Sequence, residues 1–555
     1  MKLIHPLVLS IFMILITLPS CKKVLDVDSS RFLKTNNYEL NTSNQGIYAM
    51  SGIFNQLQKV AERYVLLGEL RGDLMDVTNN ASLYLKQINN FEITSDNPYN
   101  NIKDYYAIIN NCNYLIHKID TSVISHGVKV LYKEYAATKA IRAWTYMQIA
   151  LNYGKATYYE NPILNIDDAN RSYPQYSITE LANVLVPDLQ PWKDIEYPAY
   201  GQIGELNSNV FYFPIRFLIG ELYLWGGQYE MAANEYHDLL YKQQIGSYFY
   251  QAWLTSVKGE FIGGINYNYY SSEILSVIGT TSENGGGSHL KELSWPFNDM
   301  IGSKIRQNMI KPSAQSIYNW DNQIYYDADS ITKVAGDLRG RLSSYTSDGP
   351  FTYGESTPGY ENYIIKFYDH DYGLNNSEII PTCKGSLLYL RYAEAVNRLG
   401  KPNLAFAVLK NGLNKPNMAN PKIVPASEIP YPRPSYMDFD TTCFNLKMSG
   451  SVVVHPANIG MHARGCGHTE VASDYVIPPL SSKEDSILYV EDQIKLELAL
   501  ETAFDGNRFH DLMRMAIRRN DPAYLANTVA EKYTGNKEAI RARLMDMNNW
   551  YLPKK

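Results

Sequence analysis

The sequence predicts a protein dominated by α-helices, in which helical hairpins carry long irregular insertions. Three observations support this fold class: apolar residues recur at helical spacing in several segments, one helix-turn-helix pattern occurs twice, and two blocks rich in small and polar residues interrupt it. The chain has 555 residues, of which 45% are hydrophobic and 19% are charged. It is therefore large and apolar enough to bury an extensive core, and too apolar for a disordered protein.

The N-terminus has the layout of a secretory signal. An apolar run at residues 7–18 follows Lys2 and ends in Leu18-Pro19-Ser20-Cys21, which resembles the lipobox of bacterial lipoproteins. The run is shorter than the roughly 20 residues that a helix needs to span a bilayer. We expect cleavage before a lipidated Cys21; the alternative is an ordinary secreted protein in which this cysteine is coincidental. The expected organisation is a signal peptide at 1–20, a lipidated leash at 21–42 and a single domain at 43–555.

The first strongly periodic segment, residues 131–154, predicts a helix. Ala137, Ile141, Trp144 and Leu151 follow the i, i+3/i+4 rule. Gly154 is expected to end the helix.

A helix-turn-helix pattern occurs twice, at a constant offset of 173 residues. We expect residues 217–236 and 390–409 to form equivalent hairpins within helical segments near 211–241 and 386–414. Small residues at a helix crossing allow close approach, as in tetratricopeptide units. The matching positions are Gly220, Glu221, Gly227 and Ala232 in the first copy, and Ala393, Glu394, Gly400 and Ala405 in the second.

Two irregular blocks interrupt the helices, near 247–382 and 415–479. The first is rich in Gly, Asn, Ser and Tyr, which indicates long loops and short strands inserted into a helical scaffold, where binding sites are common. A last helical repeat is expected near 488–515. It contains a helix at 491–504, a break at Asp505-Gly506 and a second helix from Asn507.

Charge and motifs exclude several classes of function. The formal net charge is −6, without long runs of one sign, so nucleic acid is not an expected partner. No nucleophile elbow, zinc-protease motif or kinase motif occurs, and no cofactor is expected. The tripeptide Arg71-Gly72-Asp73 matches an adhesion motif, but its apolar neighbours predict a partly buried turn.

Metal binding is not expected either. One group of possible zinc ligands has a spacing that matches no known zinc pattern, and two acidic pairs lack the Gly and terminal Glu of a calcium loop. Cys443 and Cys466 could form a disulfide in an oxidising compartment, but the sequence alone does not establish this bond. The zinc candidates are His455, His462, Cys466 and His468, and the acidic pairs are Asp327 with Asp329 and Asp369 with Asp371.

Aromatic residues are the candidates for ligand contact. The chain has 46 Tyr against 17 Phe and 7 Trp, and tyrosine combines a flat apolar face with a hydroxyl group. Each candidate has an alternative role, in which its ring packs a loop onto the helices. The aromatic residues in loop-like segments that we expect to contact a ligand are Tyr99, Trp295, Trp320, Tyr325 and Tyr326.

Several segments together resemble the SusD/RagB family of outer-membrane nutrient-binding lipoproteins. They are the start LPSCKKVLDVD, the helix AIRAWTYMQIALNYG, the pair FLIGELYLWGGQYEMAANEY and LLYLRYAEAVNRLG, the stretch IGMHARGCGH, and the C-terminal LELALETAFDGNRFHDLMRMAIRR. Their order along the chain carries the resemblance more than any single motif.

The resemblance implies a bundle of four tetratricopeptide-like helix pairs and a role without catalysis. Members act as lids on TonB-dependent outer-membrane transporters, to which they deliver oligosaccharides or peptides. It therefore implies a lipid-anchored protein of the outer membrane, facing the outside, whose partner is such a barrel. In such a site aromatic faces would stack on the ligand, and neighbouring Asn, Asp and Arg would supply hydrogen bonds. Arg508 and Asp511, one helical turn apart, are expected to form an ion pair in the scaffold.

Two other functions remain open at this stage. Helical-repeat scaffolds often bind only proteins, so the chain could be a structural component of an outer-membrane complex. A secreted glycosidase is the second alternative, since any acid-rich chain offers carboxylate pairs.

Overall fold

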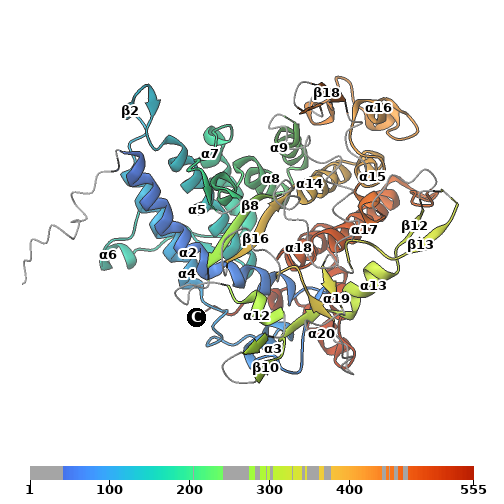
Figure 1. Ribbon diagram of the computed structural model, residues 1–555, viewed down its shortest axis with the longest axis horizontal. Coiled ribbons are helices and arrows are strands. Elements are labelled where there is room, and N and C mark those ends of the chain that lie inside the picture. Colours follow the sequence, from blue (N-terminus) through green and yellow to red (C-terminus); the bar gives the residue numbers. More distant parts are fainter. Residues whose placement is uncertain are drawn as a thin grey trace, which may run out of the picture.

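Figure 1 shows the computed structural model of the protein. Several parts of the chain discussed above lie outside the described residues: the predicted signal peptide at 1–20 with its lipobox, and Cys21, Trp295, Asp369, Asp371, Cys443, His455 and His468. The structure describes residue 40 and residues 42–203, 206–241, 274–281, 288–294, 297–299, 304–327, 329, 331–340, 344–346, 362–367, 377–439, 445–448, 451–454, 460–466 and 473–554.

Helices dominate the described residues. In chain order they are α2 (Ser43–Glu69), α3 (Leu83–Asn89), α4 (Ile102–Lys118), α5 (Tyr132–Tyr153), α6 (Ile166–Ala169), α7 (Ile178–Leu189), α8 (Ile215–Trp225), α9 (Tyr229–Tyr241), α12 (Leu290–Ser294), α13 (Ala314–Asp321), α14 (Gly385–Arg398), α15 (Pro402–Lys410), α16 (Lys415–Ala419), α17 (Lys483–Glu501), α18 (Arg508–Arg519), α19 (Pro522–Ala530) and α20 (Lys537–Leu544).

The strands are short and pair two by two. They are β1 (Met75–Val77) with β11 (Ile310–Pro312), β2 (Ile124–Ser125) with β3 (Val128–Lys129), β4 (Ala156–Thr157) with β5 (Gln175–Tyr176), β6 (Gln202–Ile203) with β7 (Leu206–Asn207), β8 (Ile274–Thr281) with β16 (Ser377–Lys384), β9 (Phe297–Asp299) with β10 (Lys304–Arg306), β12 (Ile324–Tyr326) with β13 (Lys333–Ala335), β14 (Tyr345–Thr346) with β15 (Tyr363–Ile364), and β17 (Asn445–Met448) with β18 (Ser451–Val454).

Successive helices pack against one another along the chain. The contacts run from α4 and α5 through α7, α8 and α9 to α14, α15 and α17, and then through α18 to α19 and α20 (Figure 1). Helix α2 packs across this row, against α4, α5 and α18. The apolar core follows the same path, and the predicted helix-dominated fold class is confirmed.

The two hairpins predicted from the offset of 173 residues are present and equivalent. Helices α8 and α9 form the first, and α14 and α15 form the second. The turn of each contains a glycine in the left-handed region, Gly227 and Gly400, both with a φ of 74°. A Cβ on Gly220 would lie 2.5 Å from the ring of Tyr236, so the missing side chain makes room for this tyrosine. Gly154 likewise caps α5 with a φ of 80°, as expected.

A long insertion separates the two hairpins in sequence, yet α9 packs directly against α14. Within the insertion, β8 and β16 form an antiparallel ladder, and β16 runs directly into α14 (Figure 1). Apart from β8 and β16, which have eight residues each, its described strands have two or three residues, as expected of loops added to a helical frame.

The C-terminal helices differ from expectation at one boundary. Helix α17 begins at Lys483, eight residues before the predicted start, because Ser482 caps it by accepting a hydrogen bond from the Asp485 amide. The predicted break at Asp505-Gly506 is present, and Gly506 has a φ of 95°. Helix α18 then starts as predicted, with Asn507 at its N-cap.

The expected ion pair between Arg508 and Asp511 is wrong. Arg508 binds Asp73, at 2.6 Å from Nε to Oδ1 and 2.9 Å from Nη2 to Oδ2. Asp511 accepts from Arg391 at 2.6 Å and lies 3.1 Å from Arg514. Tertiary partners therefore replace the local helical pairing.

The tripeptide Arg71-Gly72-Asp73 is buried. Arg71 donates to the carbonyl oxygens of Leu67 and Trp550, and Asp73 holds Arg508. The motif ties α2 to the C-terminal helices and offers no exposed side chain for adhesion. Within the described ranges, no helix is both long enough and apolar enough to cross a bilayer.

Candidate functional site

Three distant segments come together where the C-terminal half of α2 passes α3 and α12, in the lower part of Figure 1, and Glu62 of α2 bonds to both of the others. We define the Tyr99 cluster as Glu62, Tyr84, Tyr99, His289 and Glu292. Glu62 belongs to α2, Tyr84 to α3, and Tyr99 to the loop between α3 and α4. His289 directly precedes α12 and Glu292 lies in it, so the long insertion contributes to the cluster.

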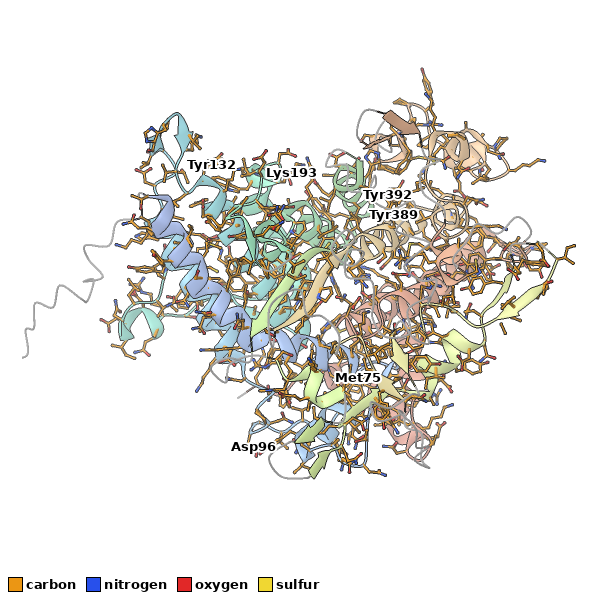
Figure 2. All side chains as sticks on the ribbon, in the orientation of Figure 1. Met75, Asp96, Tyr132, Lys193, Tyr389 and Tyr392 are labelled. Carbon is orange, nitrogen blue, oxygen red and sulfur yellow. The ribbon has the colours of Figure 1, made fainter. Side chains whose placement is uncertain are left out.

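Buried asparagines hold the loop that carries Tyr99. Asn97 donates from Nδ2 to the Tyr84 carbonyl at 3.1 Å, and its Oδ1 accepts from the Tyr99 amide at 3.0 Å. Asn100 donates to the carbonyl oxygens of Thr94 and Pro553. Because these amides bond to backbone groups, they position the loop instead of facing a ligand. Asp96, in the same loop, lies at the outer edge of the molecule (Figure 2).

Glu62 joins the loop to the insertion. Its Oε1 accepts from the Tyr99 hydroxyl at 3.0 Å, and its Oε2 accepts from the His289 amide at 2.5 Å. Burial raises the pKa of Glu62, against these two hydrogen bonds, which lower it. Burial and the nearby Glu62 carboxylate raise the pKa of the Tyr99 phenol, so Tyr99 stays protonated and donates to Glu62.

The outer side of the cluster is open to solvent. His289 Nδ1 lies 2.7 Å from Glu292 Oε2, with 51% and 41% of these side chains exposed. Tyr84 is 40% exposed and Tyr99 is half-buried. The cluster thus presents the Tyr99 ring beside an imidazole and a carboxylate that solvent can reach, while Tyr84 is joined to the Tyr99 loop through its carbonyl oxygen.

This arrangement is suited to binding a hydroxylated ligand. An aromatic ring offers a flat apolar face, and the imidazole and carboxylate can exchange hydrogen bonds with hydroxyl groups. Both oxygens of Glu62 already accept from Tyr99 and His289, so this carboxylate is engaged with the protein. Because Tyr99 and His289 donate to both oxygens of Glu62, this carboxylate is suited to a structural role and not to that of a proton donor or nucleophile.

Two of the predicted aromatic residues lie in the interior. Trp320 is 0% exposed, donates from Nε1 to the Leu500 carbonyl at 3.2 Å, and stacks on Tyr345. Tyr325 is 2% exposed and donates to Asp337 Oδ2 at 2.6 Å. Neither ring has a free face for a ligand, which corrects the sequence-based expectation for these two positions. The burial of each indole or phenol with a hydrogen-bond partner explains its presence in the core.

Tyr326 lies apart from the Tyr99 cluster. It belongs to the hairpin of β12 and β13 at the right of Figure 1, far from α12. Its hydroxyl donates to Asp474 at 3.2 Å, and the Lys333 ammonium lies 5.1 Å from the centre of its ring. The structure therefore does not unite the predicted aromatic residues in one site. Tyr99 alone of the described candidates joins the cluster.

The described members of the possible zinc group have other partners. His462 Nδ1 lies 3.0 Å from Glu497 Oε1, and its ring stacks on Tyr475 at 3.9 Å. Cys466 contacts the Ala463 carbonyl. No cluster of three or more metal-ligating side chains occurs in the described ranges.

Sequence reasoning missed Glu62, Tyr84, His289 and Glu292. Glu62 lies inside a long helix with nothing local to mark it, and Tyr84 is one tyrosine among many. His289 ends the Gly-rich stretch GGGSH, which lacks a phosphate-binding signature. The hydrogen bond between Glu62 and His289 spans 227 residues of sequence.

Comparison with solved structures decides the fold. The chain is similar to a SusD superfamily protein from Bacteroides vulgatus, with a TM-score of 0.59, 14% identity and coverage of 91% of this chain and 94% of the other. The chain has the SusD fold. The chain is also similar to surface glycan-binding protein A from Bacteroides fluxus, with a TM-score of 0.55, 15% identity and coverage of 90% of this chain and 94% of the other.

A laminarin-binding SusD-like protein is also similar, with a TM-score of 0.52, 14% identity and coverage of 92% and 98%. No protein-family model matches the sequence, and no curated protein matches it. The resemblance to SusD/RagB is thus confirmed at the level of the fold.

Proposed function

We propose that the protein is a non-catalytic binding protein for oligosaccharides, with the Tyr99 cluster as part of its ligand site. The half-buried Tyr99, fixed by Asn97 and Glu62 beside an exposed imidazole and carboxylate, carries this proposal. Two proteins with the same fold are described as a surface glycan-binding protein and a laminarin-binding protein, which supports an oligosaccharide over a peptide.

The geometry suits capture followed by release. The loop is held in place by Asn97 and Asn100 before a ligand arrives, so little conformational entropy is lost on binding. The cluster lies at the surface, and a shallow site can let a ligand leave again for transport. Glu62 is bound to the protein through both oxygens, which favours binding over hydrolysis.

The N-terminal sequence supplies the proposed location. Residues 1–20 would direct export, and acyl chains on Cys21 would anchor the remaining chain, organised as one domain from residue 43, to the outer membrane. Each buried CH₂ contributes about 0.8 kcal/mol, so several acyl chains hold a protein firmly. With the SusD fold, this location supports a role as the outward-facing lid of a TonB-dependent transporter.

Replacing Tyr99 should separate the two contributions of its side chain. For an oligosaccharide that the protein binds, Tyr99→Ala is expected to weaken binding about tenfold, which is about 1.4 kcal/mol, because the ring is lost. Tyr99→Phe keeps the ring and removes the bond to Glu62, so its effect is expected to stay within about threefold, or 0.7 kcal/mol. Isothermal titration calorimetry measures both.

Tyr48→Ala serves as the matched control. Tyr48 is 75% exposed, and it lies in the first turns of α2, at the opposite end of that helix from Glu62. Its replacement should leave the affinity unchanged. Equal affinities for the wild type and Tyr99→Ala would show that the ligand binds elsewhere.

A further inference from the structure

A cavity lies outside the Tyr99 cluster. It has a volume of about 430 Å³ and opens between the ladder of β1 and β11, helix α13 and the turn from α19 to α20. No residue of the Tyr99 cluster lines it. Its volume falls in the range of small-molecule sites, which is about 300–1,000 Å³.

Two opposite charges face each other across the ladder at this cavity. Asp76 of β1 is the register partner of Lys311 of β11, so their side chains leave the same face of the ladder. Both line the cavity and both are half-buried. Among the described residues, neither takes part in an ion pair, and Asp76 Oδ1 accepts only from the Val77 amide, at 2.8 Å. The charge of Asp76 also acts on the nearby Lys532, so Lys311 is the charge left for a ligand to balance, while Asp76 can still accept a hydrogen bond.

A buried lysine forms part of the cavity wall. Lys532 donates to the carbonyl oxygens of Leu70 and Met75 and to Asn89 Oδ1, at 2.6, 3.1 and 2.9 Å. Its three protons are therefore engaged, and it has no free donor for a ligand. Burial lowers the pKa of Lys532 to about 8, so the ammonium remains mostly protonated at neutral pH. Met75, one of its partners, lies inside the molecule (Figure 2).

The rest of the lining combines amides with apolar surface. Asn362, Thr534 and Asn536 offer hydrogen-bonding groups, while Pro312 and Ile317 offer carbon atoms.

Asp76 is the first of the carboxylates that act on Lys532, followed by Asp73 and Glu69, so the charge of Lys532 is already countered. Lys311 has no ion-pair partner among the described residues. A ligand carboxylate would balance Lys311, whereas the ammonium of a zwitterion would compete with Lys532 for Asp76.

We propose that the cavity between β1, β11, α13 and the α19–α20 turn binds a carboxylated sugar. The sugar carboxylate pairs with Lys311, and its hydroxyl groups bond to Asp76 and the neighbouring amides. The C–H face of its ring lies against Pro312 and Ile317. Since the cavity shares no residue with the Tyr99 cluster, this inference and the proposed function can fail separately.

The test compares glucuronate with glucose, which carries a hydroxymethyl group in place of the carboxylate, and with glycine as a zwitterion. Titration of the purified protein is expected to show saturable binding of glucuronate, at least about tenfold tighter than that of glucose or glycine. The affinity should fall as salt is added, because a charge pair with a half-buried lysine is partly screened.

Two variants locate the binding. Lys311→Met removes the charge, and Thr534→Trp fills the mouth of the cavity from an exposed position without changing charge. Each should lower the glucuronate affinity at least about tenfold, whereas Lys422→Met, at an exposed site that does not line the cavity, and Tyr99→Ala should leave it unchanged. Unchanged melting curves check the fold of each variant.

Three results would overturn the inference. They are glucuronate binding that does not saturate by about 10 mM, affinity for glucose or glycine equal to that for glucuronate, and full affinity in both Lys311→Met and Thr534→Trp. If Thr534→Trp lost glucuronate binding while Lys311→Met kept full glucuronate affinity, the contact assigned between the sugar carboxylate and Lys311 would also be contradicted. Loss of oligosaccharide binding in Tyr99→Ala, with glucuronate binding retained, would support both proposals independently.

Discussion

Gly68→Ala is expected to destabilise the protein by at least about 3 kcal/mol, because helix α2 touches the turn before α18 at this glycine. A Cβ on Gly68 would lie 1.8 Å from the carbonyl oxygen of Gly506 and 2.4 Å from its carbonyl carbon. The turn cannot easily move away. Gly506 has a φ of 95°, its amide donates to Glu69 Oε1 at 2.8 Å, and the ring of Tyr64 packs against it. Thermal and denaturant unfolding, followed by circular dichroism, measure the loss.

Gly52→Ala provides a matched control in the same helix. A Cβ at Gly52 would meet nothing within 4 Å, and this position is exposed. Alanine costs less conformational entropy than glycine in a helix, so a gain of about 0.5–1 kcal/mol is expected. A Gly68→Ala variant as stable as the wild type would mean that α2 and the turn do not approach as the structure shows.

The second large effect is expected at Asp511, in the buried charge network that joins the helical repeats. Glu221 and Glu394 occupy equivalent places in the two hairpins, and each forms an ion pair with an arginine of a later helix. Arg391 Nε lies 2.9 Å from Glu221 Oε1, and Arg514 Nε lies 2.7 Å from Glu394 Oε1. Asp511 lies between these arginines, at 2.6 and 3.1 Å. The network thus connects α8, α14 and α18.

Asp511→Ala is expected to cost about 3–5 kcal/mol, because it leaves the guanidinium groups of Arg391 and Arg514 buried without this counter-charge. Both arginines are at most 2% exposed. Equilibrium unfolding of the variant measures the loss of stability. Replacing an exposed acid, by Glu538→Ala in α20, should change the stability by less than about 0.5 kcal/mol. A similar small loss in Asp511→Ala would contradict a role of the network in holding the repeats together.

The network also predicts sensitivity to acid. Burial alone would raise the pKa of Glu394, but Arg514 and Arg391 outweigh it and hold this pKa below its usual value. The stability that such a carboxylate contributes is fully present above its pKa in the unfolded chain, near 4.5. It is lost as the pH falls through the lower pKa of the folded protein.

The scaffold could be predicted from the sequence because local signals define it. Gly154 ends α5, Gly227 and Gly400 form equivalent turns, and Gly506 breaks the last repeat; each has a positive φ. The start of α17 was missed because its first turn is charged and shows no apolar period.

Contacts between distant segments could not be predicted. Arg508 binds Asp73, 435 residues away, in place of its helical neighbour Asp511. Trp320 and Tyr325 lie in segments that look like loops, yet both rings are buried. Tyr99 could be selected from its Asn-rich loop, but its partner Glu62 could not, since no residue near Glu62 marks it as part of a site.

Titration of the purified protein against a panel of neutral oligosaccharides and mixed peptides tests the central claim most directly. Our account predicts saturable binding of at least one oligosaccharide, weakened by Tyr99→Ala and unaffected by Tyr48→Ala, without turnover of the ligand. Saturable binding of peptides alone, binding of neither class, or cleavage of the bound sugar would contradict it.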